Sequence, residues 1–475
     1  MKNFKKFILV ILILPCIFLF NACSFFGSTK VYVTDIKQTS QIGETTTYTV
    51  YYSDGSHSVF TVQNGSDGDD VDDLTIESIM AYCEANELDF DSFLKQYLTV
   101  VQENKSIKDA TSIAIQSAVT VWCEVPTSNY YNIKDKELAC GAGVIYKMEA
   151  EYSYIITNYH VVYNTLSDFS NKIASTIHIF QYGTSEEVYK TNQTDSNGYP
   201  LLSYGDGAVY AEYVGGSLTN DIAVLKVSTD DLLTYNENAK PVTIAEDYSL
   251  GETAIAIGNP ACEGFSVTSG VVSVISEELN MTGADEATSC TFRVMRIDTA
   301  INGGNSGGGL FNINGELIGI VNARVVSVEY ENMAYALPID HVSKIADNLI
   351  YYYESEQTPS NVKALTLNIG LTSKNSRAVY NSTENETTLQ EDVVITSISV
   401  GVGNDMDLKI GDIIKSISIN GTKYDITQAY QVDDVLLNVR EGDKLLITVT
   451  RNKITTYCAL AEDAGISSSQ LIEIA

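Results

Sequence analysis

The sequence has little positive charge. Its 475 residues include 29 Lys and Arg against 61 Asp and Glu, which gives a formal net charge of −32. Nucleic acid binding needs patches of Lys and Arg on the protein surface, and the sequence contains no such cluster, so nucleic acid is not expected as a partner. The excess negative charge also argues against a soluble catalyst of strongly acidic substrates.

Histidine is scarce too, with four residues, and the cysteines are dispersed. No C-x-x-C pair occurs, and no cysteine clusters with histidine, so we do not expect a metal site. An exported protein could form disulfides, but the spacing does not say whether any form. The cysteines beyond the first 23 residues are Cys83, Cys123, Cys140, Cys262, Cys290 and Cys458.

The first residues are typical of a targeting signal. A basic start precedes the apolar run Phe7–Phe20, which Pro15 interrupts and which is shorter than the ~20 residues of a membrane-spanning helix. Phe20-Asn21-Ala22-Cys23 resembles a lipoprotein cleavage box. We therefore expect an extracytoplasmic protein that a lipid on Cys23 anchors to the cell membrane. Release after cleavage and an uncleaved anchor remain the alternatives.

The chain is longer than one hydrophobic core usually supports, so several domains are expected. Short β-branched runs separated by Gly, Asn and Asp turns indicate a mainly β protein with a barrel domain. Within the barrel, the polar segment 184–207 is expected to be a long surface loop. The predicted segments are a lipoprotein signal peptide (1–23), a small β-hairpin unit (24–66), an acidic linker (67–73), a helical segment (74–117), the barrel domain (118–350), a linker (351–363), a second β-rich domain (364–461) and a C-terminal tail (462–475).

One glycine-rich stretch, Gly303–Gly309, surrounds a single serine, Ser306, between two strand-like segments. Glycine allows sharp turns and leaves backbone amides accessible. A serine hydroxyl among such amides can act as a nucleophile beside an oxyanion hole, whereas a glycine-rich hairpin with an incidental serine is the plainer alternative.

A serine nucleophile needs a base and a group that orients the base. His160 directly follows the apolar strand Tyr154–Tyr159. Asp221 lies at the start of another apolar strand, which continues through Leu225. The order His160, Asp221, Ser306 is that of chymotrypsin-like enzymes. The α/β-hydrolase nucleophile elbow is excluded, because it requires a helix after the serine and both partners downstream.

These residues lie in motifs that resemble the HtrA (high-temperature-requirement) family of trypsin-like serine proteases. The resemblance covers about half the chain. The matching segments are Ile156–Val162, Asp221–Val227, Gly258-Asn259-Pro260, Ser266–Ser273, Asp298–Gly308 and Tyr335–Asp340. It implies a trypsin-like double β-barrel over 118–350 and no cofactor or metal.

The resemblance also implies the roles of individual residues. His160, Asp221 and Ser306 would form the catalytic triad, with the oxyanion hole at Gly304, Asn305 and Ser306. A primary specificity pocket with an apolar floor, suited to small or medium aliphatic residues, would be lined by Ala300, Ile301, Asn302, Asn322, Ala323 and Arg324.

Two glycines depart from the family pattern, Gly303 and Gly309. Extra glycine makes a loop more costly to order by ~0.5–1 kcal/mol per position. We therefore hypothesise that the oxyanion loop is not ordered at rest, in which case Gly303→Pro would raise basal activity.

The second β-rich domain resembles a PDZ domain, through Leu408–Ile414 and Ile419-Asn420-Gly421. The resemblance implies that peptide C-termini bind at Ile369, Gly370 and Leu371 by β-strand addition. A PDZ-like spacer without a ligand is the alternative.

The function predicted from the whole sequence is a membrane-anchored serine endopeptidase that cleaves unfolded or exported proteins. A chaperone-like or peptide-binding surface lipoprotein is the alternative function. Family members often form trimers, but residues 30–117 do not resemble their usual trimerising N-terminus, so the sequence leaves open whether the chain forms a homo-oligomer such as a trimer.

Overall fold

The computed structural model describes residues 33–42, 45–52, 57–63, 106–323, 333–381, 386–460 and 465–474. The chain divides into two compact units, residues 1–100 and 101–475. In the first unit, the described residues form an antiparallel sheet in the order β1 (Val33–Ile42), β2 (Thr45–Tyr52) and β3 (His57–Gln63). The predicted β-hairpin is therefore a three-stranded sheet. Cys23, the acidic linker at 67–73 and most of the predicted helical segment lie outside the described residues.

The second unit begins with α4 (Ile107–Ala114) and the short helix η1 (Ile115–Ser117). A capping box fixes the start of α4, because the Ser106 Oγ accepts from the Asp109 N–H and the Asp109 carboxylate accepts from the Ser106 N–H. Ala110 and Ala114 on its inner face are buried. No helix among the described residues is long and apolar enough to cross a membrane.

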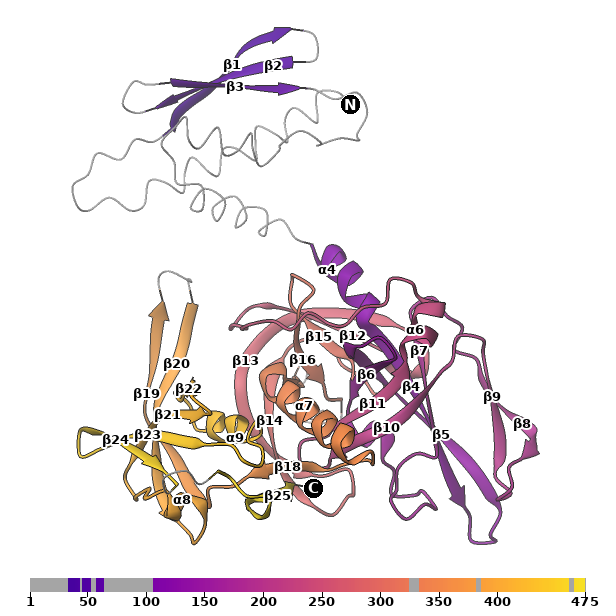
Figure 1. Cartoon of the computed structure of the whole chain (residues 1–475). Helices are drawn as coiled ribbons and strands as arrows, with labels where there is room; N and C mark the ends of the chain where they lie inside the picture. The colour runs from indigo at the N-terminus through magenta and orange to yellow at the C-terminus, as the bar shows by residue number, and fades with distance from the viewer. Residues whose placement is uncertain are drawn as a thin grey trace. The chain divides into compact units, whose positions relative to one another are not determined.

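The first barrel is a closed ring of six strands in the order β10-β11-β6-β5-β4-β7 (Figure 1). Its strands are rich in Val and Ile, and their inward side chains form one apolar core. The strands are β4 (Ala118–Ser128), β5 (Lys134–Met148), β6 (Tyr152–Thr157), β7 (Thr176–Gln181), β10 (Val209–Ser217) and β11 (Ile222–Ser228), with α5 (Tyr159–Val162) and α6 (Thr229–Tyr235) after β6 and β11. The segment expected to be a loop contains the hairpin β8 (Val188–Thr194) and β9 (Pro200–Tyr204) instead.

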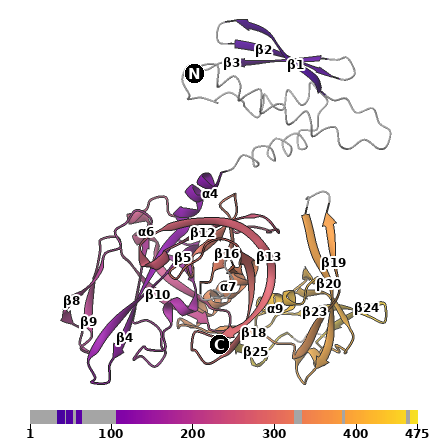
Figure 2. The same cartoon turned by 180° about the vertical axis from the view of Figure 1, so that it is seen from behind.

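The second barrel closes in the order β12-β13-β14-β17-β16-β15 and has its own core. Figure 2 shows the long strand β13 curving around it. Its elements are β12 (Thr253–Gly258), η2 (Pro260–Cys262), β13 (Ser266–Thr282), β14 (Ser289–Ile297), β15 (Gly309–Phe311), β16 (Leu317–Val321) and β17 (Ala334–Pro338). The two closed barrels confirm the predicted trypsin-like fold.

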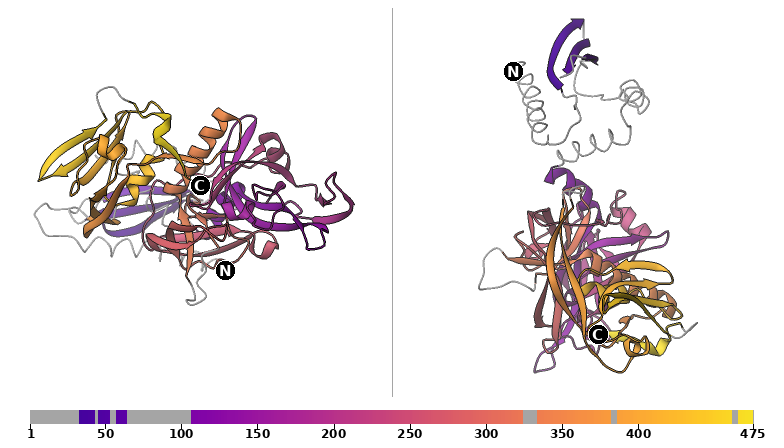
Figure 3. Two further views of the ribbon diagram at one scale, coloured as in Figure 1. Left: turned by 90° about the horizontal axis from the view of Figure 1, so that it is seen from below. Right: turned by 90° about the vertical axis from the view of Figure 1, so that its left-hand side faces the viewer.

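Helix α7 (Ile339–Glu356) follows the second barrel and packs on strands of both barrels. The left view of Figure 3 shows it in orange between the yellow C-terminal strands and the purple first barrel. It continues to Glu356, so it takes up the start of the linker expected at 351–363. The rest of that linker leads into β18 (Val362–Leu365), which pairs with β25 (Leu471–Ile474). The expected C-terminal tail therefore ends in a strand.

The C-terminal domain is a six-stranded sheet with a separate core, consistent with a PDZ domain. Its strands are β19 (Ile369–Asn381), β20 (Glu386–Ile398), β21 (Ile413–Ile419), β22 (Thr422–Asp425), β23 (Leu445–Arg451) and β24 (Ile454–Ala459), and its helices are α8 (Val402–Asp405), α9 (Tyr430–Leu436) and η3 (Ser468–Gln470).

A buried polar network joins α9 to the second barrel. Arg293, 7% exposed, donates to Asp434 Oδ2 over 2.6 Å, and His341 Nδ1 lies 2.6 Å from Asp434 Oδ1. Because removing one partner of a buried ion pair leaves the other charge uncompensated, this network fixes how α9 docks on the barrel.

Candidate active site

The three predicted catalytic residues come from three different parts of the two barrels. His160 lies in α5, immediately after β6, and Asp221 immediately precedes β11, the strand that pairs with β6. Ser306 lies in the loop between β14 and β15 of the second barrel. The strand ends of the first barrel thus supply the base and the acid, and the second barrel supplies the serine.

The side chains form one hydrogen-bonded chain. His160 Nδ1 lies 2.7 Å from Asp221 Oδ2, and His160 Nε2 lies 2.8 Å from Ser306 Oγ. A carboxylate can only accept, so we assign the imidazole proton to Nδ1, which leaves Nε2 as the acceptor for the serine hydroxyl. Asp221 is 2% exposed and Ser306 5% exposed, so water competes little for these bonds. This arrangement can remove the serine proton as the oxygen attacks a carbonyl.

Backbone and amide contacts hold Asp221 in an uncommon conformation. Its φ of 53° lies in the left-handed region, which costs about 1 kcal/mol or more for a residue other than glycine. Its carbonyl accepts from Tyr159 N–H and from Asn158 Nδ2, while its Oδ1 accepts from His160 N–H over 2.9 Å. Such strain at a site that its surroundings fix is consistent with a functional position.

Asn322 has a different place from the one predicted for it. It is 1% exposed, and its Nδ2 donates to Asp221 Oδ2 over 2.8 Å. The side chain of Asn322 is therefore a positioning group for Asp221, and a place for this segment beside the specificity pocket stays a prediction. The sequence carried no signal for this contact, because the two residues are 101 positions apart.

The oxyanion loop is held by the neighbouring loop after β12. The N–H of Asn259 donates to Gly304 O, and that of Ala261 donates to Gly303 O. The amides of Gly304 and Ser306 have no acceptor among the described residues, which leaves both free for an oxyanion. The Asn305 N–H donates to Asn302 O over 3.0 Å, so it is engaged inside the loop. We therefore assign the oxyanion hole to the amides of Gly304 and Ser306. The prediction that Asn305 is a third donor is corrected.

The surroundings of the two unusual glycines, Gly303 and Gly309, bear on the hypothesis that the oxyanion loop is not ordered at rest. A Cβ at Gly309 would lie 2.4 Å from the Phe311 ring and 2.9 Å from Val144, so close packing requires glycine there. A Cβ at Gly303 would meet no atom within 4 Å. The described loop is thus anchored on both sides, and only Gly303 remains without a packing reason.

The other predicted substrate-binding residues are spread along the same loops. Ala300 and Asn302 are exposed, and Ile301 packs partly against the second barrel's core. The Ala323 N–H donates to Ser306 Oγ over 3.2 Å, which places this segment beside the nucleophile. Arg324 lies outside the described residues. Tyr159, next to His160, is partly buried, and this desolvation raises its pKa to about 12, so it is neutral at physiological pH.

Comparisons with known proteins agree with this geometry. The model of the trypsin-like peptidase domain matches residues 141–320, a span that contains His160, Asp221 and Ser306. The chain is 26% identical over 325 residues to a serine protease Do-like HtrA of Lactococcus lactis, covering 66% of this chain and 68% of that protein. It is 33% identical over 236 residues to the serine protease Do-like HtrA of Bacillus subtilis, covering 49% of this chain and 44% of the relative.

A third relative, a serine protease HtrA-like of Staphylococcus epidermidis, is 28% identical over 344 residues, covering 70% of this chain and 51% of that protein. The chain belongs to the HtrA-type, trypsin-like serine proteases. Among solved structures, the HtrA-type protease AlgW with decapeptide is 21% identical, with a TM-score of 0.45, over 74% of this chain and 97% of that one. The alignments span about half the length of two of the three relatives.

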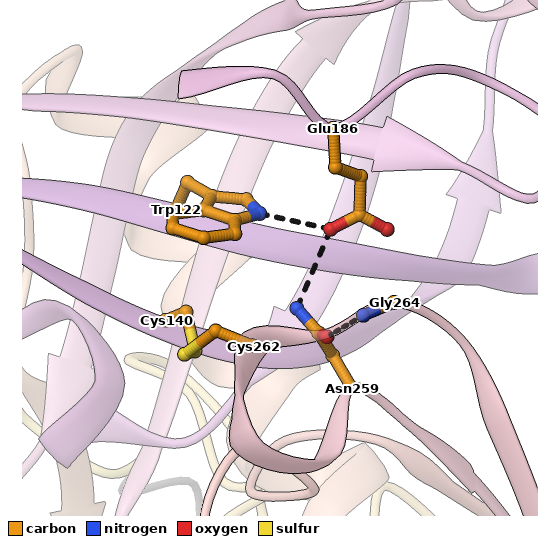
Figure 4. Close-up of a disulfide and its surroundings, with 6 residues drawn as sticks. All are labelled: Trp122, Cys140, Glu186, Asn259, Cys262 and Gly264. Atoms are coloured by element: carbon orange, nitrogen blue, oxygen red, sulfur yellow. Dashed lines mark hydrogen bonds between the residues drawn. A yellow bond between two sulfur atoms is a disulfide. The ribbon is translucent and has the colours of Figure 1, made fainter. Parts of the chain in front are cut away.

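In this HtrA-type protease, a disulfide joins the two barrels beside the active site. Cys140 of β5 is bonded to Cys262 at the end of η2, across 122 positions of sequence (Figure 4). Two residues after Cys140, the Ala142 N–H donates to Ser306 O over 2.8 Å. One residue before Cys262, Ala261 donates to Gly303 O. The disulfide therefore ties together the two segments that support the nucleophile and the oxyanion loop.

Removing this disulfide should lower both stability and activity. A long closed loop gives about 2–4 kcal/mol of stabilisation, and freeing the segment 259–262 loosens the contacts to Gly303 and Gly304. We expect Cys140→Ala/Cys262→Ala to unfold several degrees lower in calorimetry and to have kcat/KM reduced about tenfold. A reductant should produce the same change in the wild type and none in the double variant. Equal activity of both proteins would show that the loop needs no such tie.

The predicted peptide site of the C-terminal domain lies at a cavity of about 140 Å³ between the start of β19 and α9. Ile369 and Leu371 line it, together with Val432 and Leu436 of α9, while Gly370 is paired with β20. Asp433 also lines the cavity, where burial and the neighbouring Asp434 raise its pKa. Peptide capture at this cavity stays a prediction.

Proposed function

We propose that this HtrA-type protease is a membrane-anchored, extracytoplasmic endopeptidase that cleaves unfolded or exported proteins. The observation that carries the proposal is the chain of contacts from Asp221 through His160 to Ser306, with the free amides of Gly304 and Ser306 beside it. HtrA proteases act on protein substrates, and the apolar run followed by Cys23 supports export and anchoring.

The reaction follows from the assigned roles. Ser306 Oγ attacks the scissile carbonyl while His160 Nε2 takes its proton, and the amides of Gly304 and Ser306 bind the oxyanion. His160 then gives the proton to the leaving amine, which leaves an acyl-enzyme on Ser306. Water, activated by His160 in the same way, releases the second product. Asp221 stabilises the imidazolium in both steps.

The substrate class can be tested with one protein in two states. Reduced and alkylated ribonuclease is unfolded, whereas the native form presents few extended segments. The wild type should cleave the unfolded form at least tenfold faster, and Ser306→Ala should cleave neither. Equal cleavage of both forms by the wild type would contradict a preference for unfolded proteins.

The anchor needs a separate measurement in cells. Cys23→Ser removes the thiol that would carry the lipid, so we expect the variant to leave the membrane fraction or to keep an uncleaved signal. An unchanged membrane fraction and unchanged mobility in a gel would contradict the lipid anchor.

A further inference from the structure

A second cavity, of about 380 Å³, is lined by residues from both barrels. One wall comes from the segment after β7, with Tyr182 and Glu186, and the other from the loop after β12, with Cys262, Glu263 and Phe265. Neither the triad nor the predicted specificity pocket uses these residues. The lining contains two carboxylates and no Lys, Arg or His.

The chemistry of the cavity suits a cation on an aliphatic stem. Glu186 Oε2 accepts from Trp122 Nε1 over 3.0 Å and lies 3.5 Å from Asn259 Nδ2, which fixes the carboxylate (Figure 4). Its Oε1 has no donor among the described residues, and Glu263 is exposed. The rings of Tyr182 and Phe265 meet edge to face with centroids 5.7 Å apart. An ammonium or guanidinium could pair with the carboxylates while its stem packs on the rings.

The cavity is close to the reacting serine. Cys262, in its lining, is bonded to Cys140, and Ala142, two residues after Cys140, donates to Ser306 O. Cys262 also directly follows Ala261, which donates to Gly303 O in the oxyanion loop. An extended peptide advances about 3.3 Å per residue, so the second to fourth residues beyond the scissile bond lie about 7 to 13 Å from it. The Cα atoms of Cys262 and Cys140 are 6.0 Å apart, so this part of the lining lies one disulfide beyond the segment that contacts Ser306.

The cavity lies on the leaving-group side of the serine. Ala323, whose N–H meets Ser306 Oγ, belongs to the segment predicted to bind the acyl half of the substrate. Ala142, in the segment around Cys140, donates instead to the carbonyl oxygen of Ser306. This segment belongs to the first barrel. An extended substrate that crosses the serine from the 322–323 segment therefore leaves over Cys140 and Cys262.

We propose that this cavity binds a Lys or Arg side chain two to four residues after the scissile bond, with Glu186 and Glu263 as its partners. The proposal rests on the proposed endopeptidase function and adds a substrate preference to it. The formal net charge of −32 favours the approach of basic segments as well.

The test begins with a pool of peptides from unfolded proteins, cleaved by the full-length protein and mapped by mass spectrometry. Lys and Arg should be enriched at the second to fourth positions after the cut. A fluorogenic peptide built on one mapped site then carries Lys or Gln at the enriched position. The wild type should have a kcat/KM about tenfold higher for the Lys peptide, and high salt should reduce that ratio.

Three variants locate the effect. Glu186→Gln/Glu263→Gln should bring the Lys-to-Gln ratio close to one. Glu263→Gln alone should reduce the ratio to about threefold. Glu263 is exposed, so this change leaves the bonds of Glu186 to Trp122 and Asn259 in place. Glu187→Gln removes an equal charge from an exposed neighbour outside the lining and should keep the full ratio.

The outcomes separate the two proposals. Ser306-dependent cleavage with no preference for Lys, or with a preference that the Glu186 and Glu263 variants keep, overturns the cavity's role alone. Absence of Ser306-dependent cleavage from the whole pool overturns the endopeptidase function and this proposal with it.

Discussion

Asp221→Asn is expected to lower kcat by roughly 10⁴-fold with little change in folding. In the wild type, both carboxylate oxygens accept, Oδ1 from His160 N–H and Oδ2 from His160 Nδ1 and Asn322 Nδ2. An asparagine must turn its NH₂ toward one of these positions, where it faces a donor. If it faces His160 Nδ1, the imidazole proton moves to Nε2, and the base can no longer accept the serine proton.

The measurement is kcat on a mapped peptide, with calorimetry to show that the variant is folded. Asn322→Ala is the matched control, because it removes one donor to Asp221 but leaves the tautomer of His160 unchanged. We expect it to lose only about tenfold in kcat. A loss with Asp221→Asn no larger than the loss with Asn322→Ala would contradict the role assigned to the carboxylate.

Gly304→Ala is expected to lower kcat by about 10²- to 10³-fold, the usual effect of losing one oxyanion donor. Gly304 has a φ of 96°, and a Cβ there would lie 2.0 Å from Asn259 O. The backbone must therefore move, and the Gly304 N–H with it. KM should change far less than kcat, because the donor acts on the charge that develops in the transition state.

The adjacent Gly303→Ala is the control for this prediction. Its Cβ would point into open space, so kcat should stay within about twofold of the wild type. A loss at Gly303 as large as the loss at Gly304 would mean that the loop responds to any side chain and that the oxyanion amide is not the cause. A several-fold gain with Gly303→Pro would instead support a loop that needs ordering before it is active.

The barrel fold was predictable because each strand has a recognisable local sequence pattern. Runs such as Ile222–Ser228 are apolar and β-branched, and the turns between strands are rich in glycine and asparagine. The hairpin of β8 and β9 was not predictable, because β8 is polar and largely exposed and β9 has only five residues, so neither shows the apolar alternation that marks a half-buried strand. The final strand β25 was missed because its four residues are too few to show a period, and its pairing with β18 depends on the folded structure.

The catalytic residues were predictable from motif and chain order, whereas their supporting contacts were not. His160, Asp221 and Ser306 each carry a local signature, but the bond from Asn322 to Asp221 depends on how the barrels pack. The pairing of Cys140 with Cys262 likewise joins two loops that only the folded structure brings together. The same is true of the carboxylates of Glu186 and Glu263, which come from different barrels.

The most direct test of the activated serine is labelling by a peptidyl phosphonate, followed by mass spectrometry of the modified peptide. The wild type should incorporate one label per chain on Ser306, with loss of peptide cleavage in proportion to labelling. Ser306→Ala should take no label, and Asp221→Asn should be labelled far more slowly than the wild type. Undiminished cleavage of unfolded protein by Ser306→Ala, with no label on Ser306 in the wild type, would contradict the assignment.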